Sequence, residues 1–291
     1  LLLGNLASSF LAWGQVFKGG SLGGIFWWLG ERSFNLATPG IALAQVGDHL
    51  LLRPYATFSH PNSLAGFLLV SLFLLWGARE SFKNKGFFKL ALLFLGLTLF
   101  LTFSFAAYLG AGLALIIFLW QKWRQKSGLL PKIGVGAMLL LYIIAILFSV
   151  KAGLVEQKSL NERLVLAQNA LVLIKKRPLL GVGLGNFIPA QAETLPFVRQ
   201  DVNLLQPVHN IYLLIASETG LAGLLVFIVM IIYLIKAVFL KLSSDSFILY
   251  ALCLILFLGL FDHYWLTLPQ NFLLFAVVLG LINTRKNGIL E

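Results

Sequence analysis

Cysteine and charged side chains are both scarce in this sequence of 291 residues. Its single cysteine, Cys253, excludes an intrachain disulfide and argues against a thiolate metal site. Charged residues make up 11% of the chain, whereas a soluble domain has about 25%. Together with a hydrophobic content of 59% and a mean hydropathy of +0.90, this shortage argues strongly against a soluble protein.

Two further absences concern targeting and metal binding. Residues 1–17 lack a basic leader and a clean cleavage site, so they do not have the pattern of a signal peptide. No cluster of histidine, cysteine or carboxylate residues has the spacing of a metal site. We therefore predict a protein that works without a metal or another cofactor.

Apolar runs of about 15–20 residues recur along the chain, and this length suits helices that span a bilayer. We predict an all-α integral membrane protein that forms a single polytopic domain over residues 1–291. About eight spans are expected, roughly at Leu1–Phe17, Ser63–Ala78, Phe87–Phe103, Phe105–Gln121, Ile133–Val150, His209–Lys236, Phe247–Phe261 and Asn271–Asn283.

The net charge of +11 is divided unevenly between the predicted connections. Twelve of the 22 lysines and arginines, but only three of the 11 acids, lie in the connections after the second, fourth, sixth and last spans. The positive-inside rule places this side in the cytoplasm, so the charge is explained without nucleic acid. Two long loops, residues 18–62 and 151–208, then face outward.

The first outer loop contains the pair Trp27-Trp28, which we expect at the membrane interface. Within the same loop, Ile41–Leu52 could form a short hairpin around Gly47-Asp48. In the second outer loop, Ser159 and Glu162 have the spacing of a capping box, which predicts a helix over residues 160–176. This helix has an apolar stripe and is expected on the membrane surface or packed over the bundle.

A histidine and a carboxylate are associated with the sixth predicted span. His209 begins this span, and an imidazole can take up a proton near neutral pH. The alternative is that His209 only caps the helix beside Asn210. Glu218 lies about 13 Å further along, near the middle of the bilayer. Because it points away from the face of His209, we favour a structural role for Glu218.

Four arginines lie in the two outer loops, and guanidinium groups pair well with phosphate oxygens. Such a cluster suits a lipid pyrophosphate, although each arginine alone could face solvent or headgroups, as Lys175 and Lys176 could. The four are Arg53, Arg163, Arg177 and Arg199.

Two features near these candidates leave alternatives open. The Gly181, Gly183 and Gly185 spacing is more typical of a bending loop than of a nucleotide site, because no strand precedes it. Asp262 and His263, at the outer end of the seventh span, could complete a site or be ordinary loop residues.

Taken together, these residues resemble the O-antigen ligase and polymerase family. The similarity extends over most of the chain, from about residue 53 to 281. It is carried by Pro178–Phe187, by His209-Asn210-Ile211-Tyr212, by Glu218–Gly223, by Arg53–Asn62 with its final His60-Pro61-Asn62, and by Arg163.

The resemblance implies a multi-pass, C-type glycosyltransferase-like helical fold in the cytoplasmic membrane. It implies transfer of a glycan from undecaprenyl pyrophosphate, on the outer face, to lipid A core, to another glycan or to protein, by inverting chemistry without metal. His209 would be the catalytic base, and Arg163 with one or more of Arg53, Arg177 and Arg199 would hold the pyrophosphate. The supporting residues would be Asn210, Tyr212, Glu218, Gly181, Gly183, His60 and Asn62.

The chain departs from the family pattern in two places. Ser104 is followed by Phe105, where many members have a Ser-Arg pair. The chain also begins at Leu1 rather than Met and has fewer predicted spans than usual, which is consistent with N-terminal helices being absent.

Two other classes of function remain open at this point. A transporter or flippase could bind an anionic lipid-linked glycan through the arginines and Glu218 without making a bond. Against it, polar residues are sparse within the predicted spans, whereas a transporter lines a path at mid-membrane. A scaffold subunit of a cell-envelope assembly is the third possibility.

Overall fold

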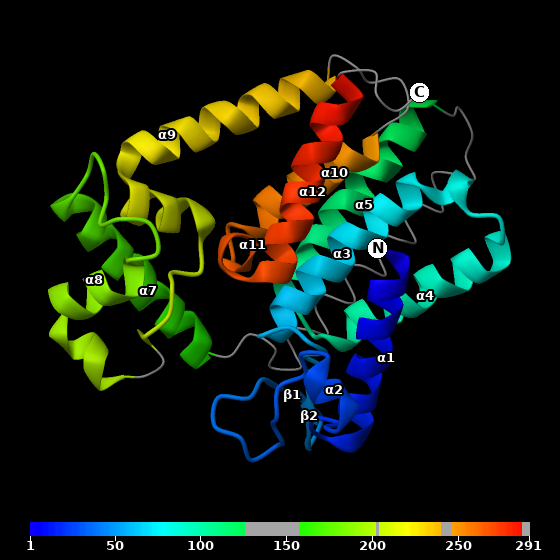
Figure 1. Ribbon diagram of the computed structural model, residues 1–291, viewed down its shortest axis with the longest axis horizontal. Coiled ribbons are helices and arrows are strands. Elements are labelled where there is room, and N and C mark those ends of the chain that lie inside the picture. The colour runs from blue at the N-terminus through cyan, green and yellow to red at the C-terminus, as the bar shows by residue number, and fades with distance from the viewer. Residues whose placement is uncertain (126–156, 202–203, 240–245, 287–291) are drawn as a thin grey trace. The chain divides into compact units, whose positions relative to one another are not determined.

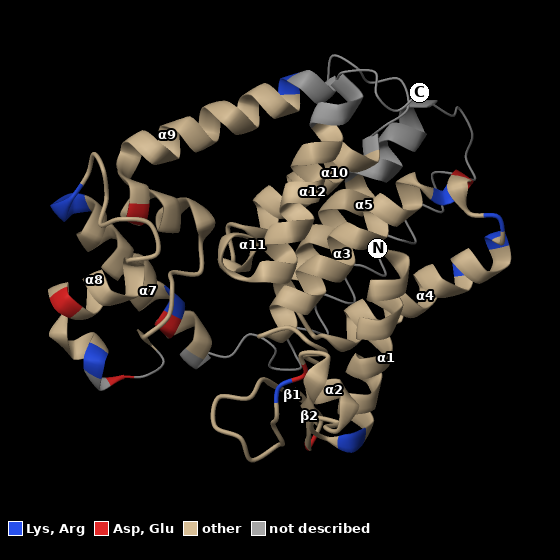
Figure 2. Ribbon diagram, in the orientation of Figure 1, with Lys and Arg blue, Asp and Glu red and all other residues tan. Residues whose placement is uncertain are grey.

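The computed structural model describes residues 1–125, 157–201, 204–239 and 246–286. The chain divides into two compact units, Leu1–Val155 and Glu156–Glu291, and each is described by itself. Figure 1 shows that helices dominate the described part of both units, and Figure 2 shows that most of the described helical ribbon is uncharged. This confirms the expectation of a mostly helical chain, whereas its organisation as a single polytopic domain stays a prediction.

Long apolar helices build the first unit. Its elements are α1 (Leu2–Lys18), α2 (Ile25–Trp28), β1 (Leu43–Val46), β2 (His49–Leu52), α3 (Pro61–Gly77), η1 (Arg79–Ser81), α4 (Lys85–Leu101) and α5 (Phe105–Gln125). Helix α3 contacts α1, α4 and α5, and α1 contacts α4. Leu64 and Leu68 of α3 are completely buried, so α3 lies at the centre of this unit.

The expected hairpin in the first outer loop is present. Strands β1 and β2 pair antiparallel, with Leu43 opposite Leu52 and Val46 opposite His49. Gly47 has a φ of 61°, a conformation that glycine adopts at little cost, so it permits the tight turn. The end of β2 leads directly into Arg53, which places this residue at the base of the hairpin.

The second unit consists of two helical groups joined through a long helix. Its elements are α7 (Gln157–Lys176), α8 (Phe187–Thr194), η2 (Pro196–Gln200), α9 (Ile211–Phe239), α10 (Ser246–Leu258), α11 (Tyr264–Thr267) and α12 (Pro269–Lys286). Side chains of α7, α8 and the start of α9, including Leu166, Phe187 and Leu214, share one apolar core. Helix α12 contacts α9, α10 and α11.

The helix expected over residues 160–176 is observed, but its predicted start is wrong. Helix α7 already includes Gln157, so Ser159 lies inside the first turn and is not the N-cap. The predicted apolar stripe of Leu160, Leu164, Leu171 and Ile174 is wrong as the buried face, because Leu160, Leu164 and Leu171 are 43%, 62% and 49% exposed. A different face, with Leu166, Ala170 and Leu173, is buried against the neighbouring elements of this unit, so the helix packs over other elements, one of the two positions considered.

The segment predicted as one continuous span, His209–Lys236, is broken in the middle. Gly220 has φ 72° and ψ −178°, so the backbone leaves the helical region and α9 changes direction there (Figure 1). Residues before the break are largely buried, whereas most of those after it are exposed. Because the break follows Glu218, the distance of about 13 Å from His209 does not depend on it, and the depth expected for Glu218 in the bilayer stays a prediction.

By length and composition, one described helix can cross a membrane, the segment Ile211–Lys236 of α9. Four shorter apolar helices lie at Pro61–Gly77, Phe105–Ile116, Phe247–Leu258 and Pro269–Ile282. The fifth expected span, Ile133–Val150, falls outside the described residues. The arrangement of eight spans thus stays a prediction.

Candidate active site around His209

His209 lies in the short connection that precedes α9, and its side chain is 18% exposed. The helix cap is supplied by the next residue, because Asn210 Oδ1 accepts hydrogen bonds from the backbone N–H groups of Tyr212 and Leu213, both at 2.9 Å. Asparagine is among the preferred residues for this role. His209 is therefore not needed as a cap, which answers the alternative raised from the sequence.

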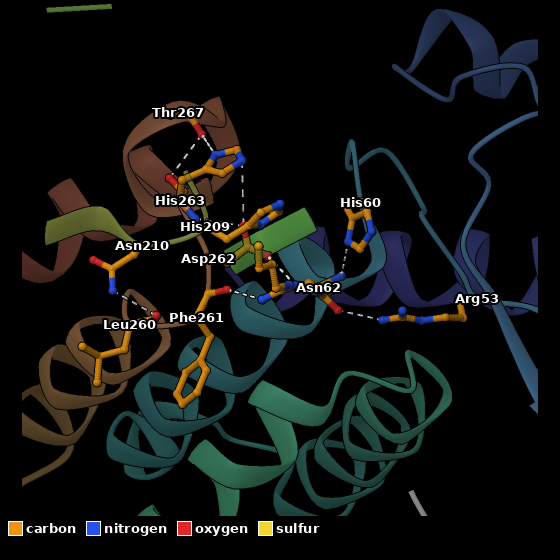
Figure 3. Close-up of polar contacts among 11 residues, drawn as sticks. Arg53, His60, Asn62, His209, Asn210, Leu260, Phe261, Asp262, His263 and Thr267 are labelled. Carbon is orange, nitrogen blue, oxygen red and sulfur yellow. Dashed lines mark hydrogen bonds and ion pairs between the residues drawn. The ribbon is translucent and has the colours of Figure 1, made fainter. Parts of the chain in front are cut away.

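The imidazole of His209 faces a buried carboxylate. Its Nδ1 lies 3.2 Å from Oδ1 of Asp262, which is 6% exposed and sits between α10 and α11 (Figure 3). The same oxygen accepts a hydrogen bond from the backbone N–H of His263 at 2.8 Å. With Asp262 accepting from Nδ1–H, the other ring nitrogen, Nε2, keeps a lone pair available for a proton.

Arg163 approaches this pair from α7. Its Nη1 donates to the carbonyl oxygen of Phe261 at 2.5 Å, and its Nη2 lies 4.0 Å from Oδ2 of Asp262. The guanidinium is partly exposed, so it remains accessible to a ligand. An arginine, a histidine and a carboxylate far apart in the sequence thus meet within one unit.

Charge around Asp262 determines how the group titrates. Burial alone would raise the pKa of Asp262, but His209, His263 and Arg163 outweigh burial and hold the pKa well below its usual range. Burial, with smaller contributions from His209 and Arg163, lowers the pKa of His263 to about 4 against the opposing effect of Asp262. At neutral pH, Asp262 is therefore ionised and His263 is uncharged.

The same three side chains could also hold a metal ion. One nitrogen or oxygen atom from each of His209, Asp262 and His263 lies within 4.8 Å of the others. Sequence spacing does not predict this group as a metal site, because His209 is 53 residues away from Asp262. Arg163 brings a positive charge to the same carboxylate, which opposes binding of a cation there.

A second polar cluster belongs to the first unit. Arg53 Nε donates to the carbonyl oxygen of Thr102 at 2.8 Å, and its Nη2 donates to Oδ1 of Asn62 at 2.7 Å. The side chain of His60 accepts from the backbone N–H of Asn62 and caps α3, which begins at Pro61 (Figure 3). The structure thus brings together Arg53, His60 and Asn62, as the sequence segment suggested.

The other two predicted arginines, Arg177 and Arg199, also belong to the second unit. Arg163 is in the second turn of α7 and Arg177 follows its last residue, so they are about 20 Å apart along the helix. Arg199 is exposed and donates to the carbonyl oxygen of Ala192. One pyrophosphate cannot contact both ends of α7.

The remaining supporting residues have structural contacts. Tyr212 donates its hydroxyl hydrogen to the carbonyl oxygen of Leu256. Glu218 is 9% exposed, and its carboxylate accepts from the backbone N–H of Phe187 at the start of α8. The N–H of Gly183 donates to the carbonyl oxygen of Glu218 at 2.8 Å, and Gly181 packs against the same turn of backbone.

Sequence reasoning did not predict the central position of Asp262, because it left open whether Asp262 completes a site or is an ordinary loop residue. The available signal was an Asp-His pair at the end of an apolar run, on the side where His209 begins another. A comparison with family models matches residues 90–228 to the family described as O-antigen ligase. A search of curated proteins gives no significant match.

Proposed function

We propose that this chain, whose residues 90–228 match the O-antigen ligase family model, transfers a glycan from undecaprenyl pyrophosphate to an acceptor at the outer face of the cytoplasmic membrane. The family indicates glycosyl transfer in polysaccharide biosynthesis, in association with the inner membrane. The assay below determines the class of acceptor, which is lipid A core, a second lipid-linked glycan or protein.

His209 is the proposed general base. Its hydrogen bond to Asp262 is the observation that carries this assignment. A carboxylate at Nδ1 fixes the tautomer with a basic Nε2 and stabilises the imidazolium that forms when the ring takes a proton. His263 is the poorer candidate, because a pKa of about 4 makes it a weak base.

Arg163 is the proposed contact for the donor pyrophosphate. It is partly exposed, and its anchor is the neutral carbonyl of Phe261 rather than a close carboxylate, since Asp262 Oδ2 is 4.0 Å away. A fixed cation near the base can stabilise the negative charge that develops on the leaving pyrophosphate. Arg53 is a second proposed phosphate contact, in the cluster of the first unit with Asn62.

The proposed step is a single displacement at the anomeric carbon. The acceptor hydroxyl oxygen forms the new glycosidic bond as the bond to the pyrophosphate oxygen breaks, and the leaving undecaprenyl pyrophosphate retains the electron pair. The hydroxyl proton passes to Nε2 of His209. Attack opposite the leaving group inverts the anomeric configuration, and no metal is required in this scheme.

The test is transfer by the purified full chain, with undecaprenyl-pyrophosphate-linked oligosaccharide and a panel of acceptors in the presence of a chelator. His209→Ala should reduce the rate by about 10²–10⁴-fold, the usual contribution of general base catalysis. Asp262→Asn should also be slow, because an amide at this position can hold the wrong tautomer of His209. The matched control is His49→Ala, which removes an exposed histidine of the hairpin.

The outcomes separate the competing assignments. Full transfer by His209→Ala would exclude the base assignment. Loss of transfer on chelation, with recovery on adding a divalent cation, would replace the metal-free scheme by a metal site at His209, Asp262 and His263. Donor that crosses the bilayer of reconstituted vesicles chemically unchanged, without any transfer, would favour a flippase.

A further inference from the structure

The connection between α7 and α8, residues 178–186, exposes three large apolar side chains. Leu179, Leu180 and Leu184 are 72%, 78% and 81% exposed. Leaving apolar area of this size in water is unfavourable, and contiguous exposed apolar patches mark sites of interaction. We call residues 178–186 the leucine loop.

The leucine loop is attached to α9 at the break in that helix. The N–H of Leu221 donates to the carbonyl oxygen of Pro178 at 2.8 Å, and the N–H of Ala222 donates to that of Leu179 at 3.4 Å. Residues 221 and 222 begin the exposed apolar part of α9, in which Leu225 and Val226 are 62% and 70% exposed. The exposed leucines and the exposed part of α9 are therefore continuous.

The continuity of the leucine loop with the exposed part of α9 indicates that lipid surrounds both segments. The segment Ile211–Lys236 is the described helix with the length and hydropathy of a membrane span, and its exposed residues all lie beyond Gly220. Before Gly220, side chains such as Ile211 and Leu214 are buried in protein. A loop bonded to the first residues of the lipid-facing part lies where that part enters the bilayer.

Positive charges accompany the leucine loop at its base. Lys175, Lys176 and Arg177 are all exposed at the end of α7. Lys176 and Arg177 line a pocket of about 480 Å³, together with polar groups of Asn186 and Thr194. Glu193 is the acidic side chain in this lining, so two cations face one anion. Basic residues beside an inserted apolar segment are the usual partners of anionic lipid headgroups.

We propose that the leucine loop inserts into the leaflet on the side of the His209 site, and that the Lys176–Arg177 pocket binds the phosphate of an anionic phospholipid. Gly220 then marks the level at which α9 enters the membrane. The part of α9 from Ile211 to Gly220 is about 14 Å long, and His209 precedes it by two residues, clear of the hydrocarbon and within reach of a water-borne acceptor. This inference does not depend on the transfer chemistry.

The depth of the loop can be measured with a fluorescent label in reconstituted membranes. With Cys253→Ser as background, Leu184→Cys carries an environment-sensitive dye, and Asp201→Cys, at an exposed polar site, provides the matched control. The label at position 184 should be quenched by lipid that carries a nitroxide near its headgroup and protected from aqueous iodide. The label at position 201 should show the reverse.

Two results would overturn insertion. One is iodide quenching at position 184 as strong as at position 201. The other is protection from iodide without quenching by spin-labelled lipid, which would mean that a second copy or another protein covers the loop.

The headgroup contact is tested by competition between lipids, with no lipid-linked glycan present. Protein in mixed phosphatidylglycerol and phosphatidylcholine should retain phosphatidylglycerol on detergent extraction, as measured by mass spectrometry. Arg177→Gln should weaken this retention about fivefold, the usual effect of one basic residue near an anionic surface. Arg199→Gln, which removes an exposed arginine outside the pocket, should leave it unchanged. Equal retention by the two variants, or none by the unaltered chain, would overturn the phosphate site.

Discussion

The two segments that carry the predicted outer-loop residues are held in place by different means. In the first unit, the segment is held by hydrogen bonds to one side chain, that of Gln15. Gln15 is completely buried in α1, accepts from the N–H groups of Tyr55 and Ala56, and donates to the Ala56 carbonyl and to Glu31. Glu31 in turn accepts from two backbone N–H groups, at Leu22 and Gly23.

In the second unit, the leucine loop is held almost entirely by backbone. Val182 donates to the carbonyl of Ser217, Gly183 to that of Glu218, and Leu221 to that of Pro178. These bonds satisfy carbonyl and N–H groups that the break at Gly220 removes from the helix ladder. Such close approach requires residues without a side chain, whereas the first unit requires one particular side chain.

We call the backbone hydrogen bonds between the leucine loop and residues 217–222 the backbone clasp. Adding one carbon within the backbone clasp is expected to be the most damaging change. Gly220 has φ 72°, and a Cβ there would collide with the carbonyl carbon and oxygen of Leu179. Gly220→Ala should cost at least about 3 kcal/mol, from backbone strain and the collision together. Thermal unfolding in detergent measures the effect.

Gly280→Ala is the matched control for this substitution. Gly280 lies in α12 of the same unit, and a Cβ there meets no heavy atom within 4 Å. Because alanine is the better helix former, this variant should be about 1 kcal/mol more stable. Equal melting temperatures for the two variants would show that the backbone clasp does not hold the loop.

Removing the side chain that anchors the first segment should have the next largest effect. Gln15→Met keeps the length of the side chain but leaves the N–H groups of Tyr55 and Ala56 without their buried acceptor. We expect a loss of about 3 kcal/mol, since each unsatisfied buried group costs about 1–3 kcal/mol. Leu11→Met, at a buried position of the same helix, should cost less than about 1.5 kcal/mol.

The two segments also differ in how far the sequence revealed them. The glycine spacing of 181, 183 and 185 predicted a bending loop, because glycine has a local and recognisable effect on the backbone. Gln15 was not singled out, because the hydrogen-bond partners of one amide in an apolar run cannot be predicted from the sequence. These partners lie up to 41 residues away and are set by the fold alone.

The same distinction applies to the candidate site. His209, Asn210 and Arg163 belong to recognisable segments, and the structure places them in one unit. Asp262 became central only because the end of α10 packs beside the start of α9, where the N–H of Ile211 donates to the carbonyl of Gly259. The sequence could not show that Arg163 and Arg177 are too far apart to bind one pyrophosphate, because that distance follows from α7, which separates them.

A change of pH should affect the second unit through His263. Burial lowers the pKa of His263 to about 4. Between pH 6.5 and 4, this side chain is therefore protonated in the unfolded chain but not in the folded chain. Stability is therefore fully present above pH 6.5 and falls as pH decreases toward 4, by at most about 3 kcal/mol.

His263→Gln should flatten the melting temperature between pH 6.5 and 4. The described hydrogen bonds of the Gln15 network include no histidine, so Gln15→Met should leave the slope of this pH dependence unchanged. A slope that survives in His263→Gln would assign the pH dependence to another group.

The smallest effect is expected at Glu218, where the backbone clasp depends on one side chain. Its Oε1 accepts from the N–H of Phe187 at 3.2 Å, and an amide oxygen can accept the same bond. Glu218→Gln should therefore preserve both the melting temperature and transfer, whereas Glu218→Ala should lose about 1–2 kcal/mol by leaving a buried N–H unpaired. If Glu218→Gln melted normally but transferred no glycan, the carboxylate would have a catalytic role, and the segment around the break would be more than a mechanical support for His209.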